Sequence, residues 1–216
     1  MDRKARYLMI DTETSNGFSH PCPYDIGMRV INNCGGVYEE LSHLTKDIFE
    51  DNPEMMQTAY YANKIPLYYE KLQNGEIDIQ TWQAIFNEFI AILRKYNIKA
   101  VIAHNARFDY RACNTLNNFI FGEGNSFFPE DIEIWDTMRM AKDVICTKPT
   151  YIKWCQNNGY VTKGGKPRAT AEILYRFISG DNDFIEAHTA LEDAKIESVI
   201  FWYCIKQKKK MTRKIF

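Results

Sequence analysis

The chain has 216 residues, of which 45% are hydrophobic and 25% are charged, and its formal net charge at pH 7 is -1. These values exclude an intrinsically disordered chain and are typical of a globular protein with one sizeable core. A net charge so close to zero also excludes a protein that coats nucleic acid by bulk positive charge, while local basic patches remain compatible with it.

The six cysteines, at positions 22, 34, 113, 146, 155 and 204, include no Cys-x-x-Cys pair and have no histidines at the spacing of a zinc site. Free thiols are typical of a reducing compartment. No apolar run approaches the roughly 18 residues needed to span a bilayer. We therefore expect a cytoplasmic protein with a single domain over residues 1–216, whose core covers about residues 5–206.

The first part of the chain reads as a β-meander. An apolar run at residues 7–14 predicts a strand, and residues 24–31 and 36–44 predict two more, joined by a turn-forming cluster at 32–36. Residues 46–79 contain two prolines and many aromatic residues, which predicts an insertion of short helices and loops. We expect most of its aromatic rings to be core residues, although a tyrosine exposed there would be able to stack on an unpaired base.

The second part alternates between helices and strands. Apolar residues at three- and four-residue spacing predict an amphipathic helix from Trp82 to Leu93. The other predicted elements are strands at 99–103 and 132–135 and helices at 106–117, 138–144, 151–156, 169–178 and 189–206. A meander followed by such alternation predicts an α/β fold with a mixed central sheet and helices on both faces.

Two acidic residues, Asp11 and Glu13, end the first predicted strand. Side chains two apart on a strand share a face, with Cα atoms ~6.6 Å apart. Two unit charges 4 Å apart repel by on the order of 4 kcal/mol at an effective dielectric constant of about 20, and a divalent cation between them would reverse the sign. Two solvated acids at a surface strand end are the ordinary alternative.

Another acidic residue, Asp109, lies shortly after the predicted strand at 99–103. Asn105 is a good N-cap residue, so Asp109 falls in the first turn of the next helix, near the positive end of its dipole. That turn is predicted at the carboxyl end of a sheet strand, where open α/β sheets bind ligands. An ordinary helix cap with a first-turn aspartate is the alternative.

The last helix begins with a polar pair. Thr189 followed by Glu192 has the spacing of a capping box, which makes Thr189 the N-cap. His188 and Asp193 then occupy the two positions that normally form a hydrophobic staple, so we expect them to be neighbours in space. An imidazole and a carboxylate give little packing energy there, which favours a chemical role more than at an ordinary helix start; a surface residue is the commoner alternative for a lone histidine in this place.

Taken together, these segments supply four carboxylates and one imidazole. Oxygen-rich sites without cysteine or clustered histidine favour Mg²⁺ or Mn²⁺ over zinc. Four acids held together need a counter-charge, and two divalent ions ~3.5 to 4 Å apart are the arrangement that attacks phosphodiesters. The pattern therefore predicts a metal-dependent phosphodiester hydrolase.

Three motifs carry a family resemblance. Residues 11–14 (DTET), 104–109 (HNARFD) and 188–194 (HTALEDA) resemble, in order, the three motifs of the DEDDh 3′–5′ exonuclease family, and above all its proofreading members in bacterial replication. Residues 135–141 resemble another segment of that family. The resemblance implies a ribonuclease H-like fold, two Mg²⁺ or Mn²⁺ ions, and removal of nucleoside 5′-monophosphates from the 3′ end of DNA. The sequence departs from close relatives at residues 15–18.

The resemblance also implies roles for individual residues. Asp11, Glu13, Asp109 and Asp193 would be the metal ligands, and His188 would be the general base, a role suited to an imidazole that titrates near ~6.5. His104 is the second choice for the base, because its place resembles a structural position in the family. The residues that would touch the terminal nucleotide are Thr12, Thr14, His104, Asn105 and Phe108.

Two other functions stay open from the sequence. The same motifs serve enzymes that degrade RNA or short oligonucleotides, although we favour single-stranded DNA as the nucleic-acid partner. A catalytically silent, polymerase-associated subunit would be expected to lack one of the five catalytic residues, all of which are present. A DNA polymerase partner is implied by resemblance alone. The basic loop at 163–168 and the basic tail at 206–216 are candidate phosphate contacts.

Overall fold

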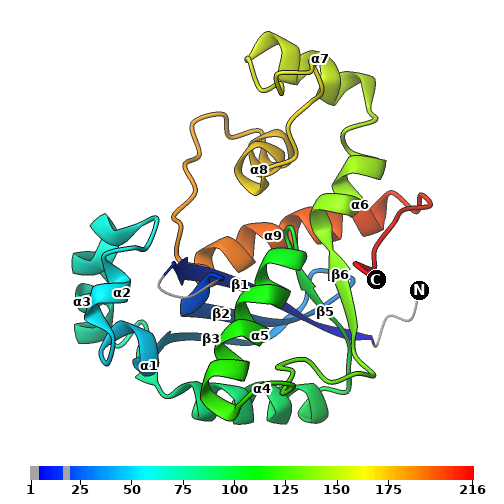
Figure 1. Ribbon diagram of the computed structural model, residues 1–216. Coiled ribbons are helices and arrows are strands. Elements are labelled where there is room, and N and C mark those ends of the chain that lie inside the picture. Colours follow the sequence, from blue (N-terminus) through cyan, green and yellow to red (C-terminus); the bar gives the residue numbers. More distant parts are fainter. Residues whose placement is uncertain (1–4, 17–19) are drawn as a thin grey trace.

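The computed structural model describes residues 5–16 and 20–216. Its centre is a mixed six-stranded sheet in the order β4-β3-β2-β1-β5-β6 (Figure 1). The strands are β1 Arg6–Ser15, β2 Cys22–Asn32, β3 Val37–Thr45, β4 Asp78–Gln80, β5 Ile98–Ala103 and β6 Glu133–Asp136. β2 runs antiparallel to both β1 and β3, whereas β5 and β6 continue the sheet in parallel beside β1. This topology is ribonuclease H-like, which confirms the predicted fold class.

The helices are α1 Lys46–Phe49, α2 Pro53–Met56, the 3-10 helix η1 Ala62–Lys64, α3 Ile65–Gln73, α4 Trp82–Lys95, α5 Arg107–Phe121, α6 Thr137–Val144, α7 Pro149–Asn157, α8 Ala171–Ser179 and α9 Ala190–Lys206. In Figure 1, α4 and α5 lie on one side of the sheet and α9, with α6 and α8 beyond it, lies on the other. Within the described residues, no helix combines the length and apolar character that a membrane span requires.

Alternation along β1 divides the core into two parts. Leu8 and Ile10 belong to the buried cluster that includes α4 and α5, whereas Tyr7 and Met9 belong to the cluster formed with α6 to α9. Because successive strand residues point to opposite faces, odd-numbered residues of β1 face α9. This parity decides where the polar residues that follow Ile10 will point.

The structure differs from the prediction at one helix cap and at one strand. α5 begins at Arg107 with Ala106 as N-cap, so Asn105 is not the cap. Asn105 instead has a left-handed backbone (φ 64°), and its N–H donates to Asp136 Oδ1 at 3.1 Å, which holds it outside the helix. The strand β4 was not predicted; it ends the aromatic insertion and extends the sheet edge by pairing in parallel with β3.

The insertion at residues 46–79 consists of short helices, as predicted, but its aromatic rings divide between core and surface. Phe49 and Tyr68 are buried, whereas Tyr60 is 85% exposed and Tyr69 is 53% exposed. The expectation that most of them are core residues was therefore wrong, since helices of four to nine residues cannot cover all their faces. The insertion also reaches the end of β1, where the Asn16 N–H donates to the Thr58 hydroxyl at 2.9 Å.

The basic tail ends in the core. The Asp136 N–H donates to the carbonyl oxygen of Arg213 at 2.7 Å, and the Ile215 N–H donates to that of Ile134 at 3.1 Å, so residues 213–215 run along β6. Ile215 is buried against the α4–α5 side of the sheet. The last residues thus cover the open edge of β6, which protects an exposed strand from pairing with another chain.

Candidate active site

β1 carries two of the predicted carboxylates on one face of the sheet. Asp11 and Glu13 continue the alternation of Tyr7 and Met9, so both side chains point to the face that α9 covers. Asp11 is partly exposed and lies opposite Gly27 of β2, whereas Glu13 is only 8% exposed. The predicted pairing of these two residues on one face follows directly from this strand geometry.

Gly27 allows α9 to come close to this pair. A Cβ added to Gly27 would lie 2.3 Å from the backbone nitrogen of Leu191 and 2.4 Å from the carbonyl carbon of Ala190. A clash with backbone atoms cannot be relieved by rotating a side chain. The first turn of α9 therefore rests directly on β2, beside Asp11, and only glycine permits that approach.

Asp109 reaches the site from the opposite face of the sheet. It lies in the first turn of α5, is 2% exposed, and accepts a hydrogen bond from the Thr12 hydroxyl at 2.8 Å. Thr12 has the opposite parity to Asp11, so it faces α5. Burial raises the pKa of Asp109 to about 7, although the Thr12 hydroxyl opposes that rise.

His188 and Asp193 are neighbours at the start of α9, as predicted. The His188 N–H donates to Asp193 Oδ1 at 3.2 Å, and His188 Nδ1 lies 3.8 Å from Asp193 Oδ2 and 3.7 Å from Glu186 Oε2. Thr189 is the N-cap, but its side chain makes no capping bond, so the predicted capping box is not formed. Glu192 instead pairs with Lys195 at 2.7 Å.

Another buried carboxylate, Glu197, was not predicted. It lies on α9, is 3% exposed, and accepts a hydrogen bond from the backbone N–H of His104 at 3.2 Å. It stands four residues after Asp193, so the two share a helix face, and this spacing is the signal that could have identified it. We call Asp11, Glu13, Asp109, Asp193 and Glu197 the acid cluster.

Ionising the carboxyl groups of the acid cluster costs free energy, because they are buried close to one another. Burial is the main cause that raises the pKa of Asp11, and the charges of Glu197, Asp109 and Asp193 add to it. Burial also raises the pKa of Glu13 to about 8 and that of Asp193 to about 9, with neighbouring acids contributing to both. Carboxylates that resist ionisation in this way gain most from a cation placed among them.

The donor set of the site fits a hard divalent cation. Ligand atoms of Glu13, His188 and Asp193 all lie within 4.8 Å of one another, and Asp11 and Asp109 act electrostatically on the same group of acids. The donors are mainly carboxylate oxygens, which Mg²⁺ and Mn²⁺ prefer, and no cysteine contributes to this group.

His104 is held on both sides of its ring. Its Nε2 lies 2.7 Å from the carbonyl oxygen of Ala169, which can only accept, so Nε2 carries the proton. Its Nδ1 lies 2.9 Å from the Thr137 hydroxyl. Burial lowers the pKa of His104 to about 4. With both nitrogens occupied, this imidazole joins β5 to the segments around it and has no free nitrogen to accept a proton from water.

The residues predicted to contact a terminal nucleotide differ in accessibility. Phe108 is 41% exposed and Thr14 is partly exposed, whereas the Thr12 hydroxyl is occupied by Asp109. Asn105 is largely exposed, at the turn before α5. Gly17 and Phe18, where the sequence departs from the motif pattern, lie outside the described residues.

The two basic segments differ in their relation to the site. The tail follows the far end of α9, and at 1.5 Å per residue Lys206 stands ~20 Å along that helix from Asp193. The loop at 163–168 closes on itself through a bridge between Val161 and Pro167. A phosphate held by the tail would thus belong to a part of a ligand remote from the acid cluster.

No protein-family model matches the chain, and no curated protein matches it. Among solved structures, the chain is similar to one described as Exonuclease X in complex with 5′ overhanging duplex DNA. The sequence identity is 16%, the TM-score is 0.47, and the similarity covers 94% of this chain and 92% of that chain. The interpretation of the site therefore depends on this chain's own side chains.

Proposed function

We propose that this protein is a metal-dependent 3′–5′ exonuclease that releases nucleoside 5′-monophosphates from DNA. The observation that carries the proposal is the convergence of Asp11 and Glu13 from β1, Asp109 from α5 and Asp193 from α9 at one end of the sheet, with His188 beside them. These segments are far apart along the chain, and a cluster of acids with raised pKa values in a ligand-binding position is typical of an active site.

Asp11, Glu13, Asp109 and Asp193 are the residues that would hold the divalent ions. Bound there, Mg²⁺ or Mn²⁺ would supply Lewis acidity for activating water and for stabilising the leaving 3′ oxygen. The Thr12 hydroxyl orients Asp109 by donating to Oδ1, and the His188 N–H orients Asp193 in the same way. These two contacts fix carboxylates that would otherwise rotate, which is the usual function of groups around metal ligands.

His188 is the proposed general base. Its Nδ1 faces the carboxylates of Glu186 and Asp193, and among the described residues Nε2 has no hydrogen-bond partner. A proton on Nδ1 would be stabilised by the two carboxylates, which leaves Nε2 to accept the proton of the attacking water. Burial lowers the pKa of His188, so the imidazole is neutral and able to accept a proton near pH 7.

A degradation assay tests this proposal. End-labelled single-stranded DNA, duplex DNA and RNA of one sequence are incubated with the protein and Mg²⁺ or Mn²⁺, with and without EDTA. We expect stepwise shortening from the 3′ end, loss of activity with EDTA and a preference for single-stranded DNA. A large preference for RNA would replace DNA as the substrate while leaving the exonuclease assignment intact.

Two variants test the assigned roles. Asp11→Ala should fold and abolish metal-dependent degradation, and an active Asp11→Ala protein would refute the metal site. His188→Ala should lower the turnover rate by ~10² to 10⁴ while Mn²⁺ binding, measured by titration calorimetry, survives. Loss of Mn²⁺ binding in His188→Ala would make His188 a metal ligand instead of the base.

A further inference from the structure

The aromatic insertion touches the imidazole of His188. The ring of Tyr61, which directly precedes η1, stacks on the His188 ring with the centroids 4.3 Å apart and the planes 17° from parallel. Tyr61 itself is half-buried and is packed edge-to-face against Tyr60 at 4.8 Å. One face of the imidazole is therefore covered by a side chain that comes from neither β1 nor α9.

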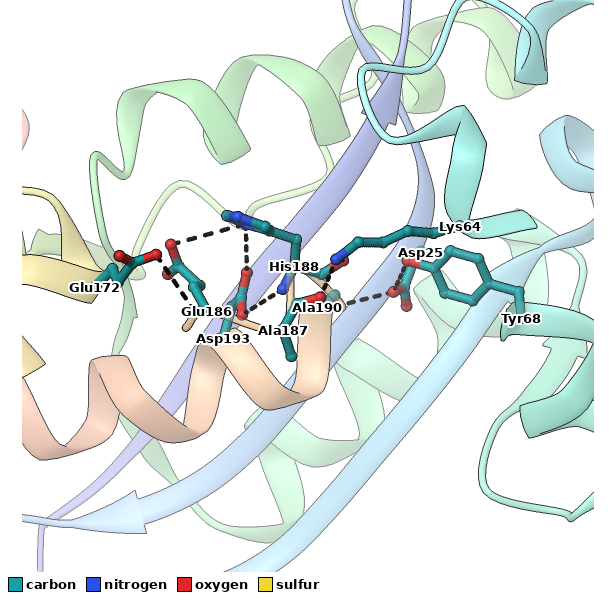
Figure 2. A network of polar contacts seen from close by, with 9 residues as sticks. All are labelled: Asp25, Lys64, Tyr68, Glu172, Glu186, Ala187, His188, Ala190 and Asp193. Carbon is teal, nitrogen blue, oxygen red and sulfur yellow. Dashed lines mark hydrogen bonds and ion pairs between the residues drawn. The ribbon is translucent and has the colours of Figure 1, made fainter. Parts of the chain in front are cut away.

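Lys64 contacts the backbone of the segment that carries the His188 side chain. Its ammonium donates to the carbonyl oxygen of Ala187 and lies 3.4 Å from that of His188 (Figure 2). The same ammonium lies 5.0 Å from the centroid of the Tyr61 ring, within the range of a cation–π contact. Lys64 thus contacts both the backbone at His188 and the Tyr61 ring that stacks on the His188 imidazole.

The conformation of His188 needs such support. Its φ is 50°, in the left-handed region that residues with a Cβ rarely adopt. A backbone of this kind persists only where surrounding contacts specify it. The supporting contacts are made by the Asp193 carboxylate, by the Tyr61 ring and by the Lys64 ammonium.

The insertion is itself fixed to the start of α9. The buried Tyr68 hydroxyl donates to Asp25 Oδ2 at 2.8 Å, and the same oxygen accepts the Ala190 N–H at 2.9 Å (Figure 2). Asp25 lies in β2 and is fully buried. The insertion, the sheet and the first turn of α9 therefore share Asp25 as one anchor, which ties the segment that carries Tyr61 and Lys64 to the start of α9.

We propose that Tyr61 and Lys64 are positioning residues for the His188 base, and that the insertion at 46–79 exists to align it. This inference rests on the proposed function, because it assigns a purpose only if His188 acts in catalysis. Neither residue exchanges a proton with the substrate. Tyr61 restrains rotation of the imidazole ring, and Lys64 restrains the backbone that carries it.

The test is a double-mutant cycle on kcat, with single-stranded DNA and Mn²⁺. Tyr61→Ala should lower kcat on the order of 10- to 100-fold with little change in KM, because a misplaced base loses most of its contribution. Tyr61→Phe, which keeps the stacking ring, should retain the wild-type kcat. In a His188→Ala background, Tyr61→Ala should cause no further loss, since nothing remains for it to position.

A matched control uses the same insertion. Tyr69→Ala removes an exposed tyrosine whose ring packs on Phe49 at 5.5 Å, and it should leave kcat and KM unchanged. Folding of every variant is checked by circular dichroism and thermal midpoint. Should Tyr61→Ala fail to fold, Lys64→Met replaces it in the same cycle, because it removes the two carbonyl contacts and keeps the ring.

Three results would overturn the inference. Equal losses from Tyr61→Ala with and without His188 would show that the ring acts independently of the base. A raised KM with unchanged kcat would show that the ring binds the nucleic acid, and an unchanged enzyme would show that it does neither. A wild-type protein that degrades no nucleic acid refutes the proposed function itself, whereas additive losses in an active enzyme refute only the positioning role.

Discussion

Replacing Glu13 by glutamine should stabilise the protein when no metal is present. Glu13 is almost fully buried among other acids, and its pKa rises from the ordinary value of 4.5 to about 8. Between those two pH values the unfolded chain has released its proton while the folded protein still holds it. The free energy of unfolding therefore falls as pH rises from about 4.5 to about 8, and Glu13→Gln removes that loss.

The magnitude follows from the size of the rise in pKa. One pKa unit corresponds to ~1.36 kcal/mol of free energy. At pH 8 about half of the folded molecules still hold the Glu13 proton, and the rise in pKa from 4.5 to about 8 then lowers the free energy of unfolding by on the order of 4 kcal/mol. At pH 5 the same arithmetic gives a gain below ~1 kcal/mol. For a chain of this length, 4 kcal/mol raises the thermal midpoint by roughly 8 to 16 °C.

The assay is thermal unfolding of wild type and Glu13→Gln in EDTA at pH 5 and pH 8. We expect Glu13→Gln to unfold at the higher temperature at pH 8, with a much smaller difference at pH 5. Added Mn²⁺ should raise the midpoint of the wild type at pH 8 and have little effect on Glu13→Gln, which lacks one ligand. A variant that is less stable at pH 8, or equally stabilised at both pH values, would refute the view that Glu13 is a strained, buried acid.

Three further outcomes are expected. Because the pKa values of several cluster acids are raised, to about 7, 8 and 9, the metal-free wild type should lose stability steadily from pH 5 to pH 9, as measured by denaturant titration; constant stability would contradict the burial of the cluster. Gly27→Ala should displace the Ala190 turn, lowering stability by ~1 to 3 kcal/mol and weakening Mn²⁺ binding in calorimetry, and a fully stable, fully active variant would show that α9 need not lie so close. His104→Leu leaves the Ala169 carbonyl without the His104 donor, whereas the Thr137 hydroxyl keeps the Ala103 carbonyl at 3.3 Å, so unfolding experiments should show a loss of ~1 to 3 kcal/mol, while the acid limb of the pH–rate profile stays where it is in the wild type.

Local geometry was sufficient to predict two of the pairings in the site. Strand parity places Asp11 and Glu13 on one face, and the start of the last helix places His188 beside Asp193, because both relations depend on local geometry alone. The carboxyl ends of β1 and β5 lie together because the strands are parallel neighbours, which brings Asp109 to the same end of the sheet. The two local pairings required only the type of each element, whereas the pairing of β1 with β5 was not predicted.

Other features depend on contacts between distant segments and have no local signal. In the sequence, Gly27 looks like any glycine inside a strand. Its importance follows from the structure, where a Cβ added to it would lie 2.3 Å from the backbone of α9. The Asn105 N–H is taken by Asp136, 31 residues away, and this contact overrides the preference of asparagine for the N-cap. Tyr61 differs from Tyr60 and Tyr69 only in what it touches, so composition could not separate the ring on His188 from its exposed neighbours.

The packing of α9 against β1 also bears on biosynthesis. Asp11 and Glu13 are translated some 180 residues before His188 and Asp193, so the acid cluster can close only after α9 has been synthesised. A nascent polypeptide that ends before α9 would carry the acidic strand β1 without Asp193 and Glu197. Metal binding at the acid cluster would then require a polypeptide that extends through α9.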